Sequence, residues 1–209
     1  MMKARLLQIL LPVAVISIGP GCAVSDAPVG AGQRQPGAQG VESMNLVFNG
    51  DFELAEARGS KPRGWTFLAE NGSAGDIERV NENPADEANP HSLRLNVTTH
   101  KGRVGVANSG RRGMNIREDQ WYDLTFSART VPTNKTFGLV VSLESPDGKV
   151  VCARATIPEV SGVWREYRLP LHTRLSHPAA RMIIAMPEAG TIWLDRVSLI
   201  PRRDDPAAP

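Results

Sequence analysis

The chain of 209 residues has little of three features that often point to a function. It holds only two cysteines, Cys22 and Cys152, and if the leader that carries Cys22 is processed, no disulfide partner remains for Cys152. The formal net charge is only +2, which gives no reason to expect nucleic-acid binding. Aromatic residues make up 5% of the chain, so few side chains are available to stack on a ligand.

Motifs of common enzyme classes are also absent from the sequence. The histidines form no H-E-x-x-H pair, and there is no G-x-S-x-G turn, P-loop or G-x-G-x-x-G fingerprint after a strand. Glycoside hydrolysis needs two carboxylates about 5–9.5 Å apart, and a sequence does not place any two of them. We therefore expect a protein that is not an enzyme, and keep a small glycoside hydrolase or polysaccharide lyase as the less favoured alternative.

The N-terminus is typical of an export signal. Lys3 and Arg5 precede an almost wholly apolar segment, Leu6–Ile18, and small residues then lead to Cys22. A basic start, a short apolar segment and small residues predict a signal peptide over residues 1–22. The apolar segment is too short to span a bilayer comfortably, which takes about 20 apolar residues.

Cys22 follows Gly21 as in the processing site of bacterial lipoproteins, although Gly19 stands where that pattern prefers leucine. We expect a lipid on Cys22, with plain secretion as the alternative. Either route takes the protein out of the cytoplasm, to the cell envelope or outer membrane as a lipoprotein, or otherwise to the periplasm or the medium. Contact with a membrane would then be made only through the lipid anchor.

Composition divides the rest of the chain into a tether, one domain and a tail. Residues 23–43 are rich in glycine, alanine, proline and glutamine, which predicts a flexible linker. Residues 202–209 are polar and proline-rich, which predicts a disordered tail. Residues 44–201 form the one domain, and a domain of this size buries about 68–70% of its unfolded surface without help from disulfides.

Alternation of apolar and polar residues predicts strands in this domain. Residues 121–128 alternate in this way, and residues 137–143 show the same period. Residues 145–148, Ser-Pro-Asp-Gly, have proline and glycine at the positions where a type I turn takes them. With residues 150–157 as the returning strand, the pattern predicts a hairpin.

Further alternating or apolar segments follow along the chain. They are residues 93–97, 104–106, 165–171, 182–186 and 191–200. No segment shows a sustained helical period flanked by caps. About ten strands at turn spacings of roughly 8–12 residues predict an all-β fold, a β-sandwich jelly roll of two antiparallel sheets.

Three stretches of the domain resemble a known family. They are Asn45–Glu53 followed by Gly64 and Trp65, then Trp121–Arg129, and finally Trp164 followed by Ile192–Leu199. Their order and spacing resemble the cellulase C-type carbohydrate-binding modules (families four, nine and twenty-two), which have a galactose-binding-like jelly roll. Similar modules precede some arabinofuranosidase catalytic domains. The resemblance covers residues 44–201 and implies a non-catalytic module that binds polysaccharide or oligosaccharide.

The resemblance also implies a structural calcium ion. Its fold brings the first and last strands together, and related modules bind calcium near that junction through carboxylates and main-chain carbonyls. Glu53, just after the first strand, and Asp195, inside the last, are the expected ligands, with Asp51 as a weaker candidate. The alternative is that Asp195 accepts backbone N–H bonds and Glu53 is solvated.

Sugar recognition combines an aromatic face with polar side chains, so the aromatic residues are sorted by the strand face they occupy. Those expected to pack rather than to bind are Tyr122, Phe126, Phe137, Trp65, Trp164 and Trp193. Trp193 is assigned to the core because it shares a face with Val197 and Leu199. Trp121 instead shares its face with polar residues and is the aromatic candidate for ligand contact.

Polar strand residues complete the predicted ligand site. They are Arg94, Asn96, Asn108, Glu144 and Arg154, and the alternative for each is a solvated strand face without a ligand. We predict polysaccharide binding by an envelope-held module, which needs an open groove with an exposed aromatic residue. The alternative is a structural or protein-interaction scaffold that docks to another envelope protein, which needs a filled or flat concave face and an exposed apolar patch.

Overall fold

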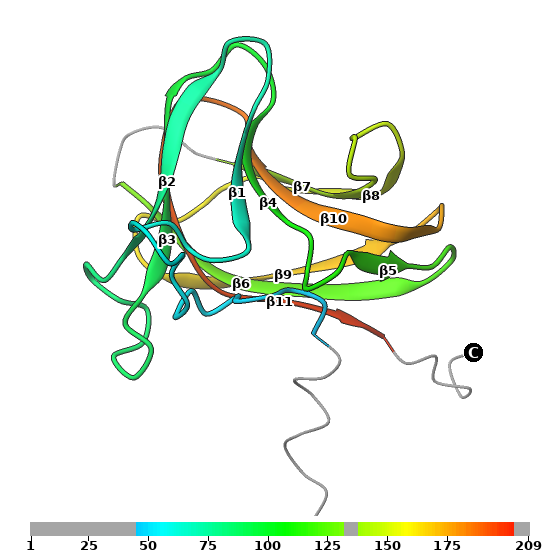
Figure 1. Cartoon of the computed structure of the whole chain (residues 1–209), viewed down its shortest axis with the longest axis horizontal. Coiled ribbons are helices and arrows are strands. Elements are labelled where there is room, and N and C mark those ends of the chain that lie inside the picture. Colours follow the sequence, from blue (N-terminus) through cyan, green and yellow to red (C-terminus); the bar gives the residue numbers. More distant parts are fainter. Residues whose placement is uncertain (1–44, 132–137, 203–209) are drawn as a thin grey trace, which may run out of the picture. The chain divides into compact units, whose positions relative to one another are not determined.

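The computed structural model describes residues 45–131 and 138–202 (Figure 1). The predicted signal peptide with Cys22 and the predicted linker lie outside the described residues, as do Phe137 and all of the predicted tail except Arg202. The described residues form strands joined by turns and loops, and none of them belongs to a helix long and apolar enough to cross a membrane.

The described residues form eleven strands in two antiparallel sheets (Figure 1). The strands are β1 (Trp65–Ala69), β2 (Ala74–Val80), β3 (Ser92–Thr99), β4 (Val104–Asn108), β5 (Met114–Ile116), β6 (Trp121–Thr130), β7 (Leu139–Glu144), β8 (Val151–Ile157), β9 (Arg165–His172), β10 (His177–Met186) and β11 (Gly190–Pro201). The six-stranded sheet has the order β1-β4-β10-β7-β8, with β5 beside β10, and the five-stranded sheet has the order β2-β3-β11-β6-β9. The predicted all-β sandwich of two antiparallel sheets is confirmed.

The core lies between the two sheets, because each strand turns every second side chain inward. Its members from the five-stranded sheet include Leu93, Leu95, Tyr122, Leu124 and Phe126, and those from the six-stranded sheet include Val106, Leu139, Val141, Met182 and Ile184. Tyr122 and Phe126 thus occupy the core positions that the alternation predicts. The other face of each sheet, called its outer face below, is where a ligand has access.

The predicted hairpin is present as β7 and β8. The Gly148 N–H donates to Ser145 O at 2.9 Å, and Gly148 has a φ of 74°, a conformation that glycine adopts at little cost. The Ser145 hydroxyl donates to the Asp147 carboxylate at 2.6 Å and fixes the turn. The turn follows directly on Glu144, the last residue of β7, and so sets the position of that carboxylate.

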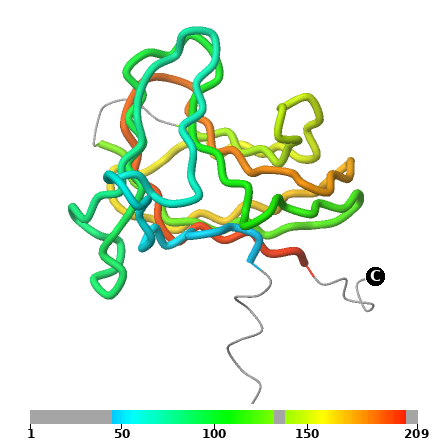
Figure 2. The backbone as a smooth tube through the Cα atoms, in the orientation of Figure 1, coloured from blue at the N-terminus to red at the C-terminus, as the bar shows by residue number. Residues whose placement is uncertain are grey.

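The first described residues lie beside the last strand (Figure 2). The Leu46 N–H donates to Leu199 O at 2.9 Å, and the Leu199 N–H donates to Asn45 Oδ1 at 3.0 Å. The Val197 N–H donates to Gly50 O at 2.8 Å, and a Cβ on Gly50 would stand 1.9 Å from Val197 O. Only glycine permits this approach, so the junction of first and last segments depends on Gly50.

A bulge in β11 changes which of its residues face the core. The register with β6 shifts between Asp195 and Ser198, and Arg196 has a φ of 51°. Leu194 packs in the core before the bulge and Val197 packs there after it. The spacing between these two inward residues is odd, so the alternation slips by one residue.

Trp193 lies on the outer face of the five-stranded sheet, which corrects the prediction that it faces the core with Val197. The two residues would share a face on an unbroken strand, but the bulge separates them. The cross-strand neighbours of Trp193 are Arg94 and Arg129. Its ring is only 8% exposed, although it lies outside the core.

Candidate functional site

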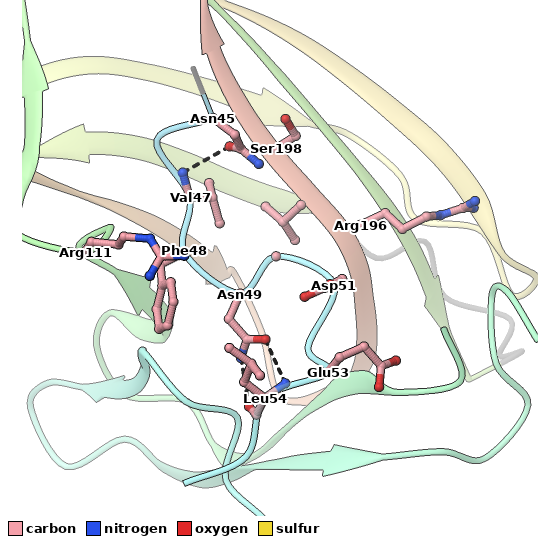
Figure 3. Close-up of a pocket in the computed structure, with 12 residues that line it drawn as sticks. Asn45, Val47, Phe48, Asn49, Asp51, Glu53, Leu54, Arg111, Arg196 and Ser198 are labelled. Atoms are coloured by element: carbon pink, nitrogen blue, oxygen red, sulfur yellow. Dashed lines mark hydrogen bonds between the residues drawn. The ribbon is translucent and has the colours of Figure 1, made fainter. Parts of the chain in front are cut away.

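Asn49 holds the loop that begins the resemblance motif (Figure 3). Its amide nitrogen donates to Leu54 O and Arg63 O, both at 2.9 Å, and its Oδ1 accepts from the Leu54 N–H at 2.9 Å. Trp65 Nε1 donates to Asn49 O at 3.0 Å, and its ring centroid lies 5.0 Å from that of Phe52. Trp65 thus has the framework role that was predicted, and this part of the motif is structural.

An open cavity of about 520 Å³ lies between this loop and β11, with Asp51 and Glu53 in its wall (Figure 3). Asp195, in β11, is 0% exposed. Its Oδ1 accepts from the Arg196 N–H at 2.7 Å, whereas its Oδ2 has no hydrogen-bond partner among the described residues. Burial, opposed by the Arg196 N–H and assisted by the charges of Glu53 and Asp51, raises the pKa of Asp195 to about 7.

These residues fit a calcium ion only in part. A buried carboxylate oxygen without a partner, such as Asp195 Oδ2, is a group that a cation would satisfy. Both oxygens of Glu53 are already engaged: Oε1 accepts from the His91 N–H at 3.0 Å, and Oε2 lies 2.6 Å from His91 Nδ1 and 3.5 Å from Arg79 Nη2. Glu53 is therefore not simply solvated, and Arg79 supplies positive charge where the ion would.

The outer face of the six-stranded sheet carries a charged network around Glu144. This carboxylate is 0% exposed. Arg181, its cross-strand neighbour on β10, donates to Oε1 from Nε at 3.2 Å and from Nη2 at 2.9 Å. Arg103, just before β4, reaches across β10, donates to both oxygens of Glu144 and donates to Ser142 Oγ at 3.0 Å. We call these four residues the Glu144 network.

Two guanidinium groups keep Glu144 ionised in spite of its burial. Burial by itself raises the pKa, but the hydrogen bonds of Arg103 and Arg181 and the charge of Arg103 outweigh it and hold the pKa of Glu144 below its ordinary value. The side chains of Arg103 and Arg181 are 22% and 18% exposed. Arg103 Nε and Arg181 Nη1 form no hydrogen bond with another described residue, so donors remain for a ligand.

Beside the Glu144 network the same outer face is apolar. The register aligns Ile183 of β10 with Ala107 of β4, and both are buried. Ala185 lies two residues further along β10 on the same face, and the partly buried Leu68 and Val140 pack against this cluster. The buried members of the cluster are closed to solvent, so only the partly buried Leu68 and Val140 present apolar surface next to the charged donors.

Arg154 also belongs to this outer face. It lies on β8 as the cross-strand neighbour of Ser142 and is exposed. Glu144 and Arg154 are thus two predicted ligand residues that the fold brings to one face. Three guanidinium groups with one carboxylate give this end of the sheet a positive charge.

Trp121 is 42% exposed, as predicted from its polar face. Its ring centroid lies 4.7 Å from that of His172 on β9, and the Arg202 guanidinium lies 5.3 Å from its centre on the side of β11. Trp121 lines an open pocket of about 480 Å³, which we call the edge pocket because it lies along β8 and β9, the outermost strands of the two sheets. Its other lining residues are Val151, Cys152, Ala153, Arg154, Pro170, His172 and Arg174.

Arg94 and Asn96 lie on the outer face of the other sheet, in an open cavity of about 390 Å³. Arg94 forms ion pairs with Glu78 and, at 3.5 Å, with Glu82. Asn96 Oδ1 accepts from the Thr191 hydroxyl at 3.0 Å. These polar groups largely satisfy one another, so they offer a ligand less than the Glu144 network does.

The same outer face holds Arg129 between two tryptophan rings. Its guanidinium lies 3.8 Å from the centre of the Trp193 ring and 5.4 Å from that of Trp164. Trp193 Nε1 donates to Glu82 Oε1 at 3.2 Å, and Trp164 Nε1 donates to Asn83 O at 2.7 Å. Both tryptophans thus have packing roles, as predicted, but they hold the loop after β2 against the outer face instead of filling the core.

Asn108 is a framework residue, and its prediction as a ligand contact is wrong. It is fully buried, and its Nδ2 donates to Phe48 O at 2.9 Å and to Gly64 O at 3.2 Å. Its Oδ1 accepts from the N–H groups of Phe48 at 3.3 Å and Gly110 at 2.9 Å. Both ends of the amide are engaged, so nothing remains for a sugar hydroxyl.

The sequence prediction missed Arg103, Ser142 and Arg181. After His177, Arg181 is the one charged residue of β10, and Glu144 is the one charged residue of β7. Opposite charges in two buried strands are compatible with a pair, but the sequence does not show that β7 and β10 are neighbours. Nothing in the sequence marks Arg103, because its reach across β10 depends on how the sheet is assembled.

No family model matches the chain. In sequence it is similar to α-L-arabinofuranosidase 1 of Arabidopsis thaliana, with 28% identity over 165 residues, which is 75% of this chain and 24% of that enzyme. α-L-Arabinofuranosidase 2 of the same plant is 29% identical over 123 residues, 55% of this chain and 18% of that enzyme. The chain thus spans about a quarter or less of the length of these relatives.

Solved structures show the same fold. An arabinose-bound family 51 α-L-arabinofuranosidase superposes with a TM-score of 0.64 and 22% identity, over 76% of this chain and 26% of that one. A family 4 carbohydrate-binding module gives a TM-score of 0.52 and 14% identity, over 75% and 99%. The family 11 module of Clostridium thermocellum, in complex with a β-1,3-1,4-linked tetrasaccharide, gives 0.50 and 17%, over 75% and 95%. The described domain therefore has a carbohydrate-binding-module fold.

Proposed function

We propose that the protein is an exported, non-catalytic module that binds polysaccharide through the outer face of its six-stranded sheet. The single observation that carries the proposal is the Glu144 network, where one buried carboxylate fixes two arginines on an accessible sheet face. The likeness to carbohydrate-binding modules and to part of arabinofuranosidases supports a glycan as the ligand.

The chemistry of the face suits a sugar. Sugar hydroxyls accept hydrogen bonds from charged donors, and the remaining N–H groups of Arg103 and Arg181 are held ready by Glu144. The partly buried Leu68 and Val140 on the same face offer apolar surface that suits the C–H face of a sugar ring. Because the arginines are held before a ligand arrives, binding costs little side-chain entropy.

The proposal that the module is not an enzyme rests on the same face. Glu144 is the one carboxylate among the strands of the six-stranded sheet that the structure describes. Glycoside hydrolysis needs a second carboxylate about 5–9.5 Å away, and one of the two must take up a proton. Glu144, with its lowered pKa, is a poor proton donor near neutral pH.

Export and anchoring are part of the proposal and rest on the sequence. Residues 1–22 have the pattern of a signal peptide, and Cys22 is the proposed lipid attachment site. A calcium ion bound by Asp195, with Glu53 and Asp51 close by, is proposed as a structural element. In this picture a lipid anchor connects the module to the membrane while the domain contacts glycan, and no nucleic acid is involved.

A glycan array probed with the full chain, with and without calcium, tests the proposal. The key variant is Arg181→Lys, which keeps the charge but loses the fork that donates two bonds to Glu144. Binding to one class of glycan should weaken about tenfold, the worth of one charge-assisted hydrogen bond. The matched control is Asn96→Ala on the outer face of the other sheet, which should leave binding unchanged. Equal binding by wild type and Arg181→Lys would sink the proposed site.

A scaffold that docks to another envelope protein is the second candidate, and one observation favours it. The aromatic residues in the described strands of the six-stranded sheet, Trp65 and Phe67, pack against the core and give the outer face no stacking ring. Arg103 also lies across this face and partly fills it. If the folded protein binds no glycan on the array, with calcium present, the scaffold function becomes the better account of the fold.

A further inference from the structure

The titratable side chains of arginine and histidine that line the edge pocket are all basic. Arg154, His172 and Arg174 line it, and none of its described lining residues carries a carboxylate. Its volume of about 480 Å³ is in the range of sites for one or two sugar rings. Trp121 and Pro170 add an apolar wall to the same space.

The two arginines of the edge pocket are free to take an anion. Both are exposed, and neither forms an ion pair with another described residue. His172, in the same pocket, already has a partner, because its Nε2 lies 2.9 Å from Asp119 Oδ1. The pocket therefore presents two unpaired guanidinium groups beside apolar surface.

The backbone fixes where these groups stand. The Arg174 N–H donates to Cys152 O at 2.9 Å, which ties β8 to the segment after β9. Trp121 is held by His172 on one neighbouring strand and by Arg202 on the other, and Arg202 is itself bound to Asp123. A ligand thus meets a preformed wall, and the Arg174 side chain can be removed without losing the main-chain contact.

We propose that the edge pocket binds the carboxylate of an acidic sugar, such as a uronic acid residue of a polysaccharide. The guanidinium forks of Arg154 and Arg174 match the two oxygens of a carboxylate, and the sugar ring lies against Trp121 and Pro170. This second site goes beyond the proposed function, because it lies at the sandwich edge and specifies a charged ligand. It shares Arg154 and Val151, the cross-strand neighbours of Ser142 and Glu144, with the outer face of the six-stranded sheet.

Calorimetric titration of the full chain with tetragalacturonate and its fully methyl-esterified form tests the proposal. The two ligands share every ring and differ only at the carboxyl groups, which are charged in the acid and neutral methyl esters in the other. The acid should bind at least about tenfold more tightly than the ester, and Arg174→Ala should remove that difference. The matched control is Arg168→Ala, because Arg168 is exposed on β9, pairs with Glu166 and lies outside the pocket. It removes the same charge and should leave binding unchanged.

Three results would overturn the edge pocket. The first is equal affinity for tetragalacturonate and its methyl ester. The second is an equal loss of affinity in Arg168→Ala and Arg174→Ala, which would mean general charge attraction. The third is no binding of tetragalacturonate or of a tetraglucuronate. The Arg181→Lys variant separates this test from that of the outer face. Loss of neutral-glycan binding in Arg181→Lys with retained acid binding would support both sites independently.

Discussion

Glu144 and Asp195 are both fully buried carboxylates, yet their surroundings give them opposite ionisation behaviour. Two arginines bond Glu144 and hold its pKa low, whereas Asp195 accepts one main-chain N–H and has its pKa raised to about 7. Burial is the largest influence on both groups, so partners and not burial decide which carboxylate stays charged. The comparison separates a carboxylate whose two oxygens are both bonded from a carboxylate with one oxygen that has no partner among the described residues.

Removing the carboxylate of the Glu144 network should have the largest effect on the free energy of unfolding. Glu144→Ala leaves Arg103 and Arg181 without their shared acceptor, and the free energy of unfolding should fall by about 3–5 kcal/mol. Urea unfolding followed by fluorescence measures the loss. Glu144→Gln, which keeps an acceptor oxygen, should lose less. A cost below about 1 kcal/mol for Glu144→Ala would show that the arginines find water instead and that the network is not structural.

The stability that Asp195 contributes should fall as the pH rises, whereas Glu144, with its lowered pKa, contributes stability that is lost as the pH falls. Its folded pKa of about 7 lies above the ordinary 3.8, so the folded state holds the proton more tightly. Stability is therefore highest below about pH 4 for this group and is lost as the pH rises toward 7, by an amount on the order of 4 kcal/mol. Thermal unfolding in a chelator between pH 4 and pH 8 should show this slope in wild type but not in Asp195→Asn.

Added calcium should affect stability through Asp195 and not through Glu144. If Asp195 binds the ion, added calcium should restore stability at pH 8 in wild type and have no effect on Asp195→Asn. Glu144→Gln is the matched control, because its site has no orphaned oxygen and its response to calcium should equal that of wild type. A calcium response that survives in Asp195→Asn would contradict this site.

The smallest effect is expected for the exposed pair on the five-stranded sheet. The side chains of Arg94 and Glu78 are 33% and 37% exposed, so water competes for both. Glu78→Gln should lower the free energy of unfolding by less than about 1 kcal/mol, and raised salt should narrow the gap to wild type further. Urea unfolding at low and high salt measures both. If Glu78→Gln lowered the free energy of unfolding as much as Glu144→Ala, buried and exposed ion pairs would contribute equally to stability and the comparison would fail.

Most of the fold follows from local patterns in the sequence. The alternation in residues 121–128 places Tyr122 and Phe126 in the core, and the Ser-Pro-Asp-Gly turn defines the β7–β8 hairpin. The exception is β11, where one bulge reverses the face of Trp193. A bulge leaves no periodic signal of its own, so a rule based on period two fails just beyond it.

The candidate sites were harder to predict, because they combine strands that are distant in the sequence. Glu144 and Arg154 were named from their strand positions, but their partner Arg181 was not, since pairing of β7 with β10 cannot be read from either strand alone. Asn108 was named only as a polar residue in a strand, yet its amide nitrogen donates both of its bonds to main-chain oxygens of Phe48 and Gly64. Trp121 was found because its exposure depends only on its own strand.

The sequence by itself determined the sandwich and the exposure of Trp121, because both follow from alternation within single strands. Tertiary structure decided which polar residues act together. Arg103 reaches Glu144 only because β4, β10 and β7 lie side by side, and Arg154 meets Arg174 only because the edges of the two sheets adjoin. The strength of a charged contact depends on distance and burial, and both are properties of the assembled sheets.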